Sequence, residues 1–122
     1  MKRQEIFEMV AKHLFQQKER SMDGKCLYRG PNGKKCAIGI LIPDEKYDPD
    51  MEGKCSYQLK EYEYDLDPAI FNTENTAFLD QLQRAHDLRS NWNSAENMRK
   101  ALQSIANDFL LDGKFLSELD FA

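Results

Sequence analysis

The segment Cys26–Asp44, CLYRGPNGKKCAIGILIPD, constrains the fold more than any other part of the chain. Its centre is Asn32-Gly33, and both residues tolerate the positive φ angles of a type I′ turn, which commonly joins the two strands of a β-hairpin. The flanking stretches Cys26–Tyr28 and Lys35–Leu41 are therefore predicted to pair as antiparallel strands.

The apolar run Cys36–Ile42 within that segment admits two interpretations. As a strand it is apolar on both faces, which is typical of a strand buried on both sides. It could equally form about one and a half turns of helix directly after the turn. Pro43 ends the run in either case, because the residue before a proline is pushed out of the helical region. We interpret the run as a strand.

Three amphipathic helices are predicted from apolar residues that recur at three- and four-residue spacing. Gly113 is expected to end the third of them. The stretch 57–64 is either a short edge strand or a helical turn, and 44–56 is predicted to be a surface loop. The three helices span residues Arg3–Lys18, Ala77–Leu88 and Ser94–Leu111.

Helices packed on a small β-hairpin give an α+β fold, and a chain of 122 residues is predicted to form a single domain. The last residues, 113–122, contain four large apolar side chains. This segment either docks on the domain or remains a mobile apolar tail.

The composition is that of a globular protein, with 41% hydrophobic and 31% charged residues. No apolar run approaches the length of about 20 residues that a membrane-spanning helix needs, so no membrane association is expected. The N-terminal segment is amphipathic and lacks the features of a signal peptide. We therefore expect a cytoplasmic protein, and its three cysteines, an odd number, are predicted to be free thiols.

The net charge of −4 is unevenly distributed. Residues 1–60 carry 12 basic and 9 acidic side chains, a net charge of +3, whereas residues 61–122 carry 5 basic and 12 acidic ones, a net charge of −7. This distribution argues against nucleic acid as a partner. The acidic half is either an ordinary solvated surface or a face that docks on a basic partner.

Cys36 is the candidate nucleophile, with His86 as its base. A thiolate at Cys36 would be stabilised by the neighbouring Lys34 and Lys35 if the cysteine began a helix. Asp87 is poorly placed to orient the base, because adjacent residues on a helix do not face each other. The alternative is a buried structural cysteine, and none of the common catalytic sequence motifs occurs in the chain.

The sequence also contains candidates for a metal site and for a binding surface. Cys26, Cys36 and Cys55 could supply zinc ligands together with a histidine, but their spacings lack the closely paired cysteines of structural zinc sites, and no metal or cofactor is predicted. The predicted turn could contact phosphate or an acidic surface, or its lysines could serve solubility alone. Trp92 is either a core residue or an interface anchor. The candidate binding residues are Tyr28, Arg29, Lys34, Lys35 and Trp92.

The segment also carries a family resemblance. The pattern C-x-Y-R-G-P-x-G-x-K-C-A-I-G-x-L-I-P-D over residues 26–44 is followed by Tyr47, Met51-Glu52-Gly53, Leu82-Gln83-x-x-His86-Asp87 and Trp92. It resembles small uncharacterised proteins encoded by phages and prophages, over about residues 5–110.

This resemblance implies a phage-type accessory protein but no established activity and no catalytic residue. Small phage proteins often modulate a host or defence protein, which is an analogy only. The expected function is occlusion of a macromolecular partner, most simply a protein, through an acidic helical face or the hairpin tip. The acidic second half, the apolar C-terminal tail and the absence of enzyme motifs motivate this expectation. The alternatives are a small cysteine-dependent enzyme that uses Cys36 with His86, and a zinc-stabilised module.

Overall fold

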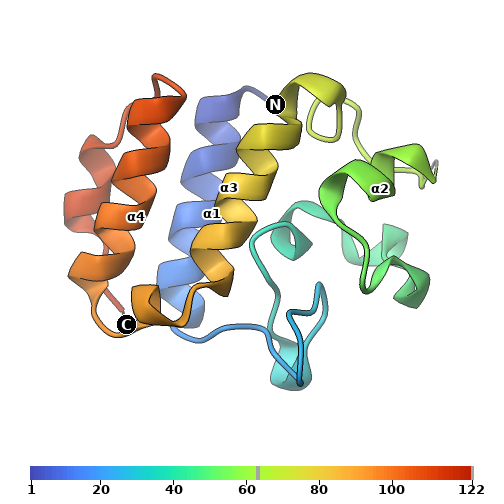
Figure 1. The fold of residues 1–122 in the computed structure, drawn as a ribbon, viewed down its shortest axis with the longest axis horizontal. Coiled ribbons are helices and arrows are strands. Elements are labelled where there is room, and N and C mark those ends of the chain that lie inside the picture. The colour runs from blue at the N-terminus through green and yellow to red at the C-terminus, as the bar shows by residue number, and fades with distance from the viewer. Residues whose placement is uncertain (63, 122) are drawn as a thin grey trace.

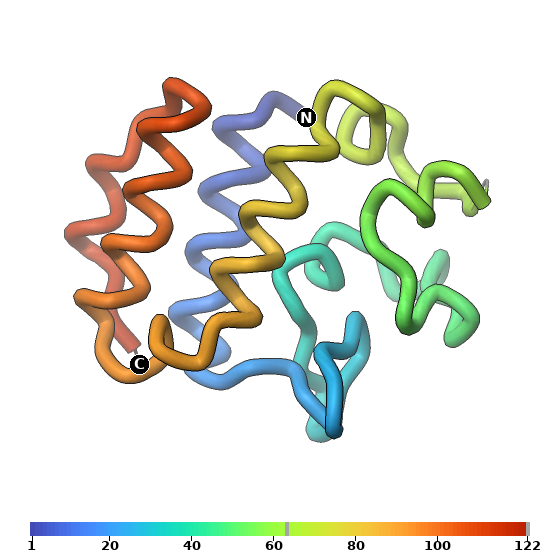
Figure 2. The backbone as a smooth tube through the Cα atoms, viewed as in Figure 1, coloured from blue at the N-terminus to red at the C-terminus, as the bar shows by residue number. Residues whose placement is uncertain are grey.

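The structure, a computed structural model, describes residues 1–62 and 64–121. In Figure 1 three long helices lie side by side, and a flank of short helices and loops covers one edge of this group. The tube in Figure 2 shows that this flank comes mainly from the middle third of the chain. The α-helices of the described residues are α1 (Arg3–Gln17), α2 (Ser56–Glu61), α3 (Thr76–Asp87) and α4 (Ala95–Asp108).

The three long helices form where the apolar spacing predicts them. Each buries its apolar stripe in a common core, in which Phe7 of α1, Phe78 of α3 and Leu102 of α4 have no solvent exposure. Burial of such side chains contributes roughly 1.5–3 kcal/mol each, which makes this core the main source of stability.

The predicted α+β fold is wrong, because the described residues contain helices and no β-strand. Asn32 and Gly33 do adopt positive φ angles, of 61° and 75°, so the chain turns where expected. The hairpin fails on either side of that turn. The run after it, predicted as a strand, instead forms a turn and the short 3₁₀ helix η2 (Gly39–Leu41).

Distant side chains explain why no hairpin forms. The backbone N–H groups of Tyr28 and Arg29 donate to the carboxylate of Glu52, at 2.9 and 3.1 Å. The carboxamide of Gln17 bonds both the N–H and the carbonyl of Lys35. A hairpin would need these backbone groups for its strand ladder. The side chains therefore satisfy the backbone in place of a second strand.

The C-terminal residues 114–121 pack against the helices. Phe115, in the 3₁₀ helix η7 (Lys114–Glu118), meets Phe7 edge to face at 5.7 Å between ring centroids. Phe121 lies 5.2 Å from Phe15 by the same measure. The described part of the tail is therefore docked.

The α4 helix ends earlier than expected, at Asp108 rather than near Gly113. Leu110 takes the left-handed conformation, with φ of 55°. The N–H of Leu111 then donates to the carbonyl of Ala106 at 2.8 Å, which closes the helix in the manner of a Schellman motif. No helix of the described residues has the length and apolar character needed to cross a membrane.

Candidate functional site

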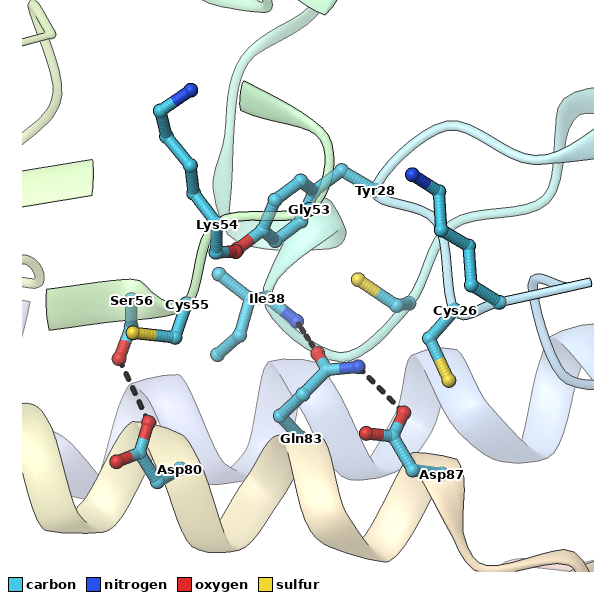
Figure 3. A pocket seen from close by; sticks show the side chains of 12 residues that line it. Cys26, Tyr28, Ile38, Gly53, Lys54, Cys55, Ser56, Asp80, Gln83 and Asp87 are labelled. Carbon is cyan, nitrogen blue, oxygen red and sulfur yellow. Dashed lines mark hydrogen bonds between the residues drawn. The ribbon is translucent and has the colours of Figure 1, made fainter. Parts of the chain in front are cut away.

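All three cysteines line one cavity of about 300 Å³, which lies between α3 and three stretches of the chain, residues 25–28, 36–38 and 53–56. Figure 3 shows Cys26 and Cys55 on opposite sides of this cavity, with the side chains of Asp80, Gln83 and Asp87 along its α3 wall. Cys36 is buried, Cys26 is half-buried and Cys55 is exposed. We call this space the thiol cavity.

Gln83 fixes the wall of the thiol cavity from its place on α3. Its side-chain oxygen accepts the N–H of Ile38 at 3.2 Å, and its side-chain nitrogen donates to Asp87 at 2.8 Å. The same carboxamide therefore anchors the η2 segment to the helix and orients a carboxylate in the cavity wall.

His86 is fully buried, and both of its ring nitrogens are engaged. The backbone N–H of Ser21 donates to Nε2 at 2.9 Å, so Nε2 must carry the lone pair. Nδ1 therefore carries the proton and donates it to Asp87 Oδ1 at 2.8 Å. The adjacent aspartate does meet the ring, contrary to the sequence-based expectation.

The thiols in the wall are held protonated. Burial, with a smaller contribution from the nearby Asp87, raises the pKa of Cys26 to about 12. Burial likewise raises the pKa of Cys36 to about 12, although hydrogen bonds from the N–H groups of Gly39 and Ile38 oppose the shift. Burial disfavours ionisation of Asp87, but hydrogen bonds from His86, Cys26 and Gln83 outweigh it and lower the pKa of that carboxyl.

This geometry does not let His86 act as the base for the candidate nucleophile Cys36. A cysteine nucleophile needs a base with a free lone pair within hydrogen-bond reach. The only lone pair of His86 is taken by Ser21, and the ring has no solvent exposure. Cys36 itself is 2% exposed. Nothing in this arrangement favours a cysteine-dependent enzyme.

The three cysteines do not gather into one metal site. The ligand atoms of Cys26, His86 and Asp87 lie within 4.8 Å of one another, and this is the one such group among the described residues. Cys36 and Cys55 line the same cavity but stand outside this group. The set Cys26, Cys36 and Cys55 therefore lacks the convergence that a zinc-stabilised module needs.

The cations of the predicted turn are paired with acids. Lys34 forms an ion pair with Glu19. Arg29 and Lys35 both contact Asp44, at 3.0 and 3.1 Å. A turn that binds phosphate needs cations that are not already paired. The structure therefore favours the alternative, in which the lysines of this turn serve solubility.

Tyr28 and Arg29 serve the fold of this segment. Tyr28 is 6% exposed, and its hydroxyl donates to the Lys54 carbonyl. The guanidinium of Arg29 donates to the carbonyl of Gly39, the first residue of η2, at 2.8 Å and to that of Ile42, just after its end, at 2.6 Å. Both candidate binding residues therefore hold the loop together.

Trp92 packs at the junction between α3 and α4, in the 3₁₀ helix η6 (Arg89–Trp92). Its indole N–H donates to the carbonyl of His86 at 2.7 Å, and its ring stacks on Phe121 at 5.9 Å. The tryptophan therefore joins the tail to the helices. This packing favours a core residue over an interface anchor.

The sequence analysis missed the contacts of Glu52 and Gln83 with distant backbone groups, and it missed Met22, whose sulfur lies 3.2 Å from that of Cys26. Glu52 and Gln83 bind backbone groups 24 and 45 residues away. No local pattern reports such contacts. Met22 was detectable, since M-D-G-K-C places a glycine in a tight turn between two sulfur-bearing residues.

No protein-family model, curated protein or solved structure matches this chain. The family resemblance seen in the sequence therefore stays a prediction.

The second histidine, His13, makes a pH dependence testable. Burial lowers the pKa of His13 below its usual 6.5. The hydrogen bond from its Nε2–H to the Lys35 carbonyl raises this pKa, but the effect of burial is larger. The unfolded chain therefore takes up this proton at higher pH than the folded chain, so His13 contributes its full stability above about pH 6.5 and loses it on acidification.

We expect the free energy of unfolding to fall more steeply from about pH 7.5 to pH 5 in the wild type than in His13→Gln, measured by urea denaturation. Glutamine keeps a donor for the Lys35 carbonyl but does not titrate. Parallel profiles for the two proteins would show that the burial of His13 is not linked to folding.

Proposed function

We propose that this chain is a small cytoplasmic, phage-type accessory protein that binds a basic surface on a partner protein. Binding occludes that surface, as a modulator of a host or defence protein would. The observation that carries the proposal is an acidic, tyrosine-bearing surface over residues 44–62 and 64–75, which we call the acidic lobe.

The charge of the acidic lobe is large for its length. In the sequence, residues 44–75 carry ten acidic and three basic side chains, a net charge of −7, so the other residues together carry +3. All three lysines are already paired: Lys46 with Asp65, Lys54 with Asp50, and Lys60 with Glu61. The excess of acid attracts a basic surface and repels phosphate.

Two tyrosines on this lobe supply apolar contact area. Tyr57 is 48% exposed and Tyr62 is 62% exposed, and both belong to or adjoin α2. The Lys54 ammonium lies 5.1 Å from the centre of the Tyr62 ring, within the range of a cation–π contact. Tyrosine is enriched in protein interfaces because it combines an apolar ring with a polar tip.

The proposal can be tested by capture of a partner from a bacterial lysate with a double variant, Glu45→Lys/Glu74→Lys. Reversal of two exposed charges on the lobe should lower the captured amount by about tenfold or more, because like charges brought together at an interface cost several kcal/mol. Capture by the wild type should also weaken as salt rises.

The matched control is Asp108→Lys/Glu118→Lys, which makes the same change in net charge at two exposed positions outside the lobe. It should capture the partner as the wild type does. Equal losses in both double variants, or no loss in either, would contradict docking through the acidic lobe.

A further inference from the structure

A tight turn brings two sulfur atoms together beside α3. Met22 and Cys26 face each other across an isolated antiparallel bridge, and Gly24 between them has φ of 73°. Residues that face each other in such a bridge carry their side chains on the same side. The Cys26 thiol accordingly lies 3.2 Å from the Met22 thioether sulfur.

The C-terminal end of α3 adds a carboxylate to this sulfur pair. The ligand atoms of Cys26, His86 and Asp87 lie within 4.8 Å of one another. His86 and Gln83 both donate to Oδ1 of Asp87, and the carboxyl group also lies beside the Cys26 thiol. The carboxylate is thus oriented by two hydrogen bonds, as metal-bound carboxylates commonly are.

We propose that Met22, Cys26 and Asp87 form a binding site for Cu(I). A thiolate and a thioether are the soft ligands that Cu(I) prefers, and the nearby carboxylate adds negative charge. Cu(I) replaces the thiol proton of Cys26, which is released to solvent. This site is separate from the acidic lobe and does not depend on the proposed docking function.

His86 supports this site without binding the ion. Its Nδ1 carries a proton because Nε2 accepts the N–H of Ser21. A metal on Nδ1 would require a proton on Nε2, which would then face the donor of Ser21. The role of His86 is therefore to hold Asp87 through the 2.8 Å hydrogen bond.

The site needs little rearrangement and has a route of entry. Two metal–sulfur bonds of about 2.3 Å, set about 120° apart, place their sulfurs about 4 Å from each other, so the present 3.2 Å must widen by about 0.8 Å. The half-exposed, unbranched Met22 can supply that movement. Cys26 and Asp87 line the thiol cavity, through which an ion can enter.

Zinc fits this set less well than Cu(I). Structural zinc is held by four ligands, mostly thiolates and imidazoles. Here one thiolate is available, the imidazole is engaged elsewhere, and a thioether is a soft ligand.

The test is an anaerobic titration of the reduced, full-length protein with Cu(I) against the chromogenic competitor bicinchoninate. The wild type should bind one equivalent at this site. Cys26→Ser should abolish that binding. Met22→Leu should lower the affinity for Cu(I) by about tenfold or more. Removal of a group that only supports a metal ligand already costs about tenfold in affinity, and Met22 is proposed as a ligand itself.

The control is Cys55→Ser, which removes an exposed thiol from the same cavity but outside the cluster. It should keep the affinity of the wild type. Three outcomes would overturn the site: full affinity in Met22→Leu, a loss in Cys55→Ser as large as that in Cys26→Ser, or a preference for Zn²⁺ over Cu(I). Leucine keeps an apolar side chain at the half-exposed position 22, so Met22→Leu is expected to fold. It therefore tests the site even if Cys26→Ser fails to fold.

Discussion

Gly39→Ala should lower the free energy of unfolding by about 3 kcal/mol, the upper part of the usual range for an overpacked core. A Cβ atom at position 39 would lie 2.4 Å from the backbone carbonyl oxygen of Tyr28. Real Cβ atoms do not approach an oxygen so closely, so one of the two backbones must move.

Neither backbone has freedom to move. The N–H of Tyr28 is bonded to Glu52, and its hydroxyl is bonded to the Lys54 carbonyl. On the other side, the N–H of Gly39 donates to the Cys36 sulfur and its carbonyl accepts from Arg29. The strain must therefore spread through the whole segment around the thiol cavity.

Gly113→Ala is the matched control for Gly39→Ala. Its Cβ would lie 2.5 Å from the Gln103 side-chain oxygen, nearly the same separation. That oxygen ends an exposed side chain, which can rotate away, and the φ of Gly113 is −106°, which alanine accepts. Its free energy of unfolding in urea should change by less than about 0.5 kcal/mol. Equal effects at the two positions would show that the backbone around Gly39 yields easily.

The long helices could be predicted because their evidence is local. In α1, for example, Phe7, Val10 and Leu14 follow the three- and four-residue spacing of a helix, and all three are fully buried. A strand would place Phe7 and Val10 on opposite faces, because successive residues of a strand alternate between its two faces. The helix ends were harder to predict, because Leu110 occupies a left-handed position where glycine is preferred.

The segment 36–42 could not be assigned locally, because a short apolar run is compatible with a buried strand and with a buried helical turn. Side chains from distant parts of the chain determine the conformation, because they accept backbone N–H groups that a strand would use. Gln83 accepts the N–H of Ile38, Gln17 that of Lys35, and Glu52 that of Tyr28. Those partners lie between 18 and 45 residues away along the chain.

The thiol cavity was beyond prediction for a related reason. The sequence suggested the three cysteines with a histidine as zinc ligands, and His86 as the base for Cys36, but nothing in it indicated that Cys26 meets Asp87. That contact depends on how the loop 20–28 crosses the end of α3, where the N–H of Ser21 binds His86 and the side chain of Arg20 binds the carbonyl of Asp87. Such crossing geometry is a property of tertiary packing.

Glu52→Gln should lower the free energy of unfolding by about 2 kcal/mol, the cost of leaving a buried or half-buried donor without its acceptor. The carboxylate accepts the N–H of Tyr28 on Oε1, and the N–H of Arg29 and the hydroxyl of Tyr47 on Oε2, the last at 2.7 Å. A carboxamide has one oxygen only. Whichever way it is turned, its NH₂ group faces a backbone N–H and one donor loses its partner.

Glu45→Gln is the control for this substitution, because it makes the same chemical change at an exposed position on the acidic lobe. It should shift the urea midpoint little, by less than about 0.5 kcal/mol in stability. Amide hydrogen exchange adds a local measurement: protection at Tyr28 and Arg29 should fall in Glu52→Gln and stay unchanged in Glu45→Gln. If the two variants were equally stable and equally protected, the Glu52 carboxylate would not be what replaces the strand ladder, and the reason for the missing hairpin would lie with Gln17 and Gln83 alone.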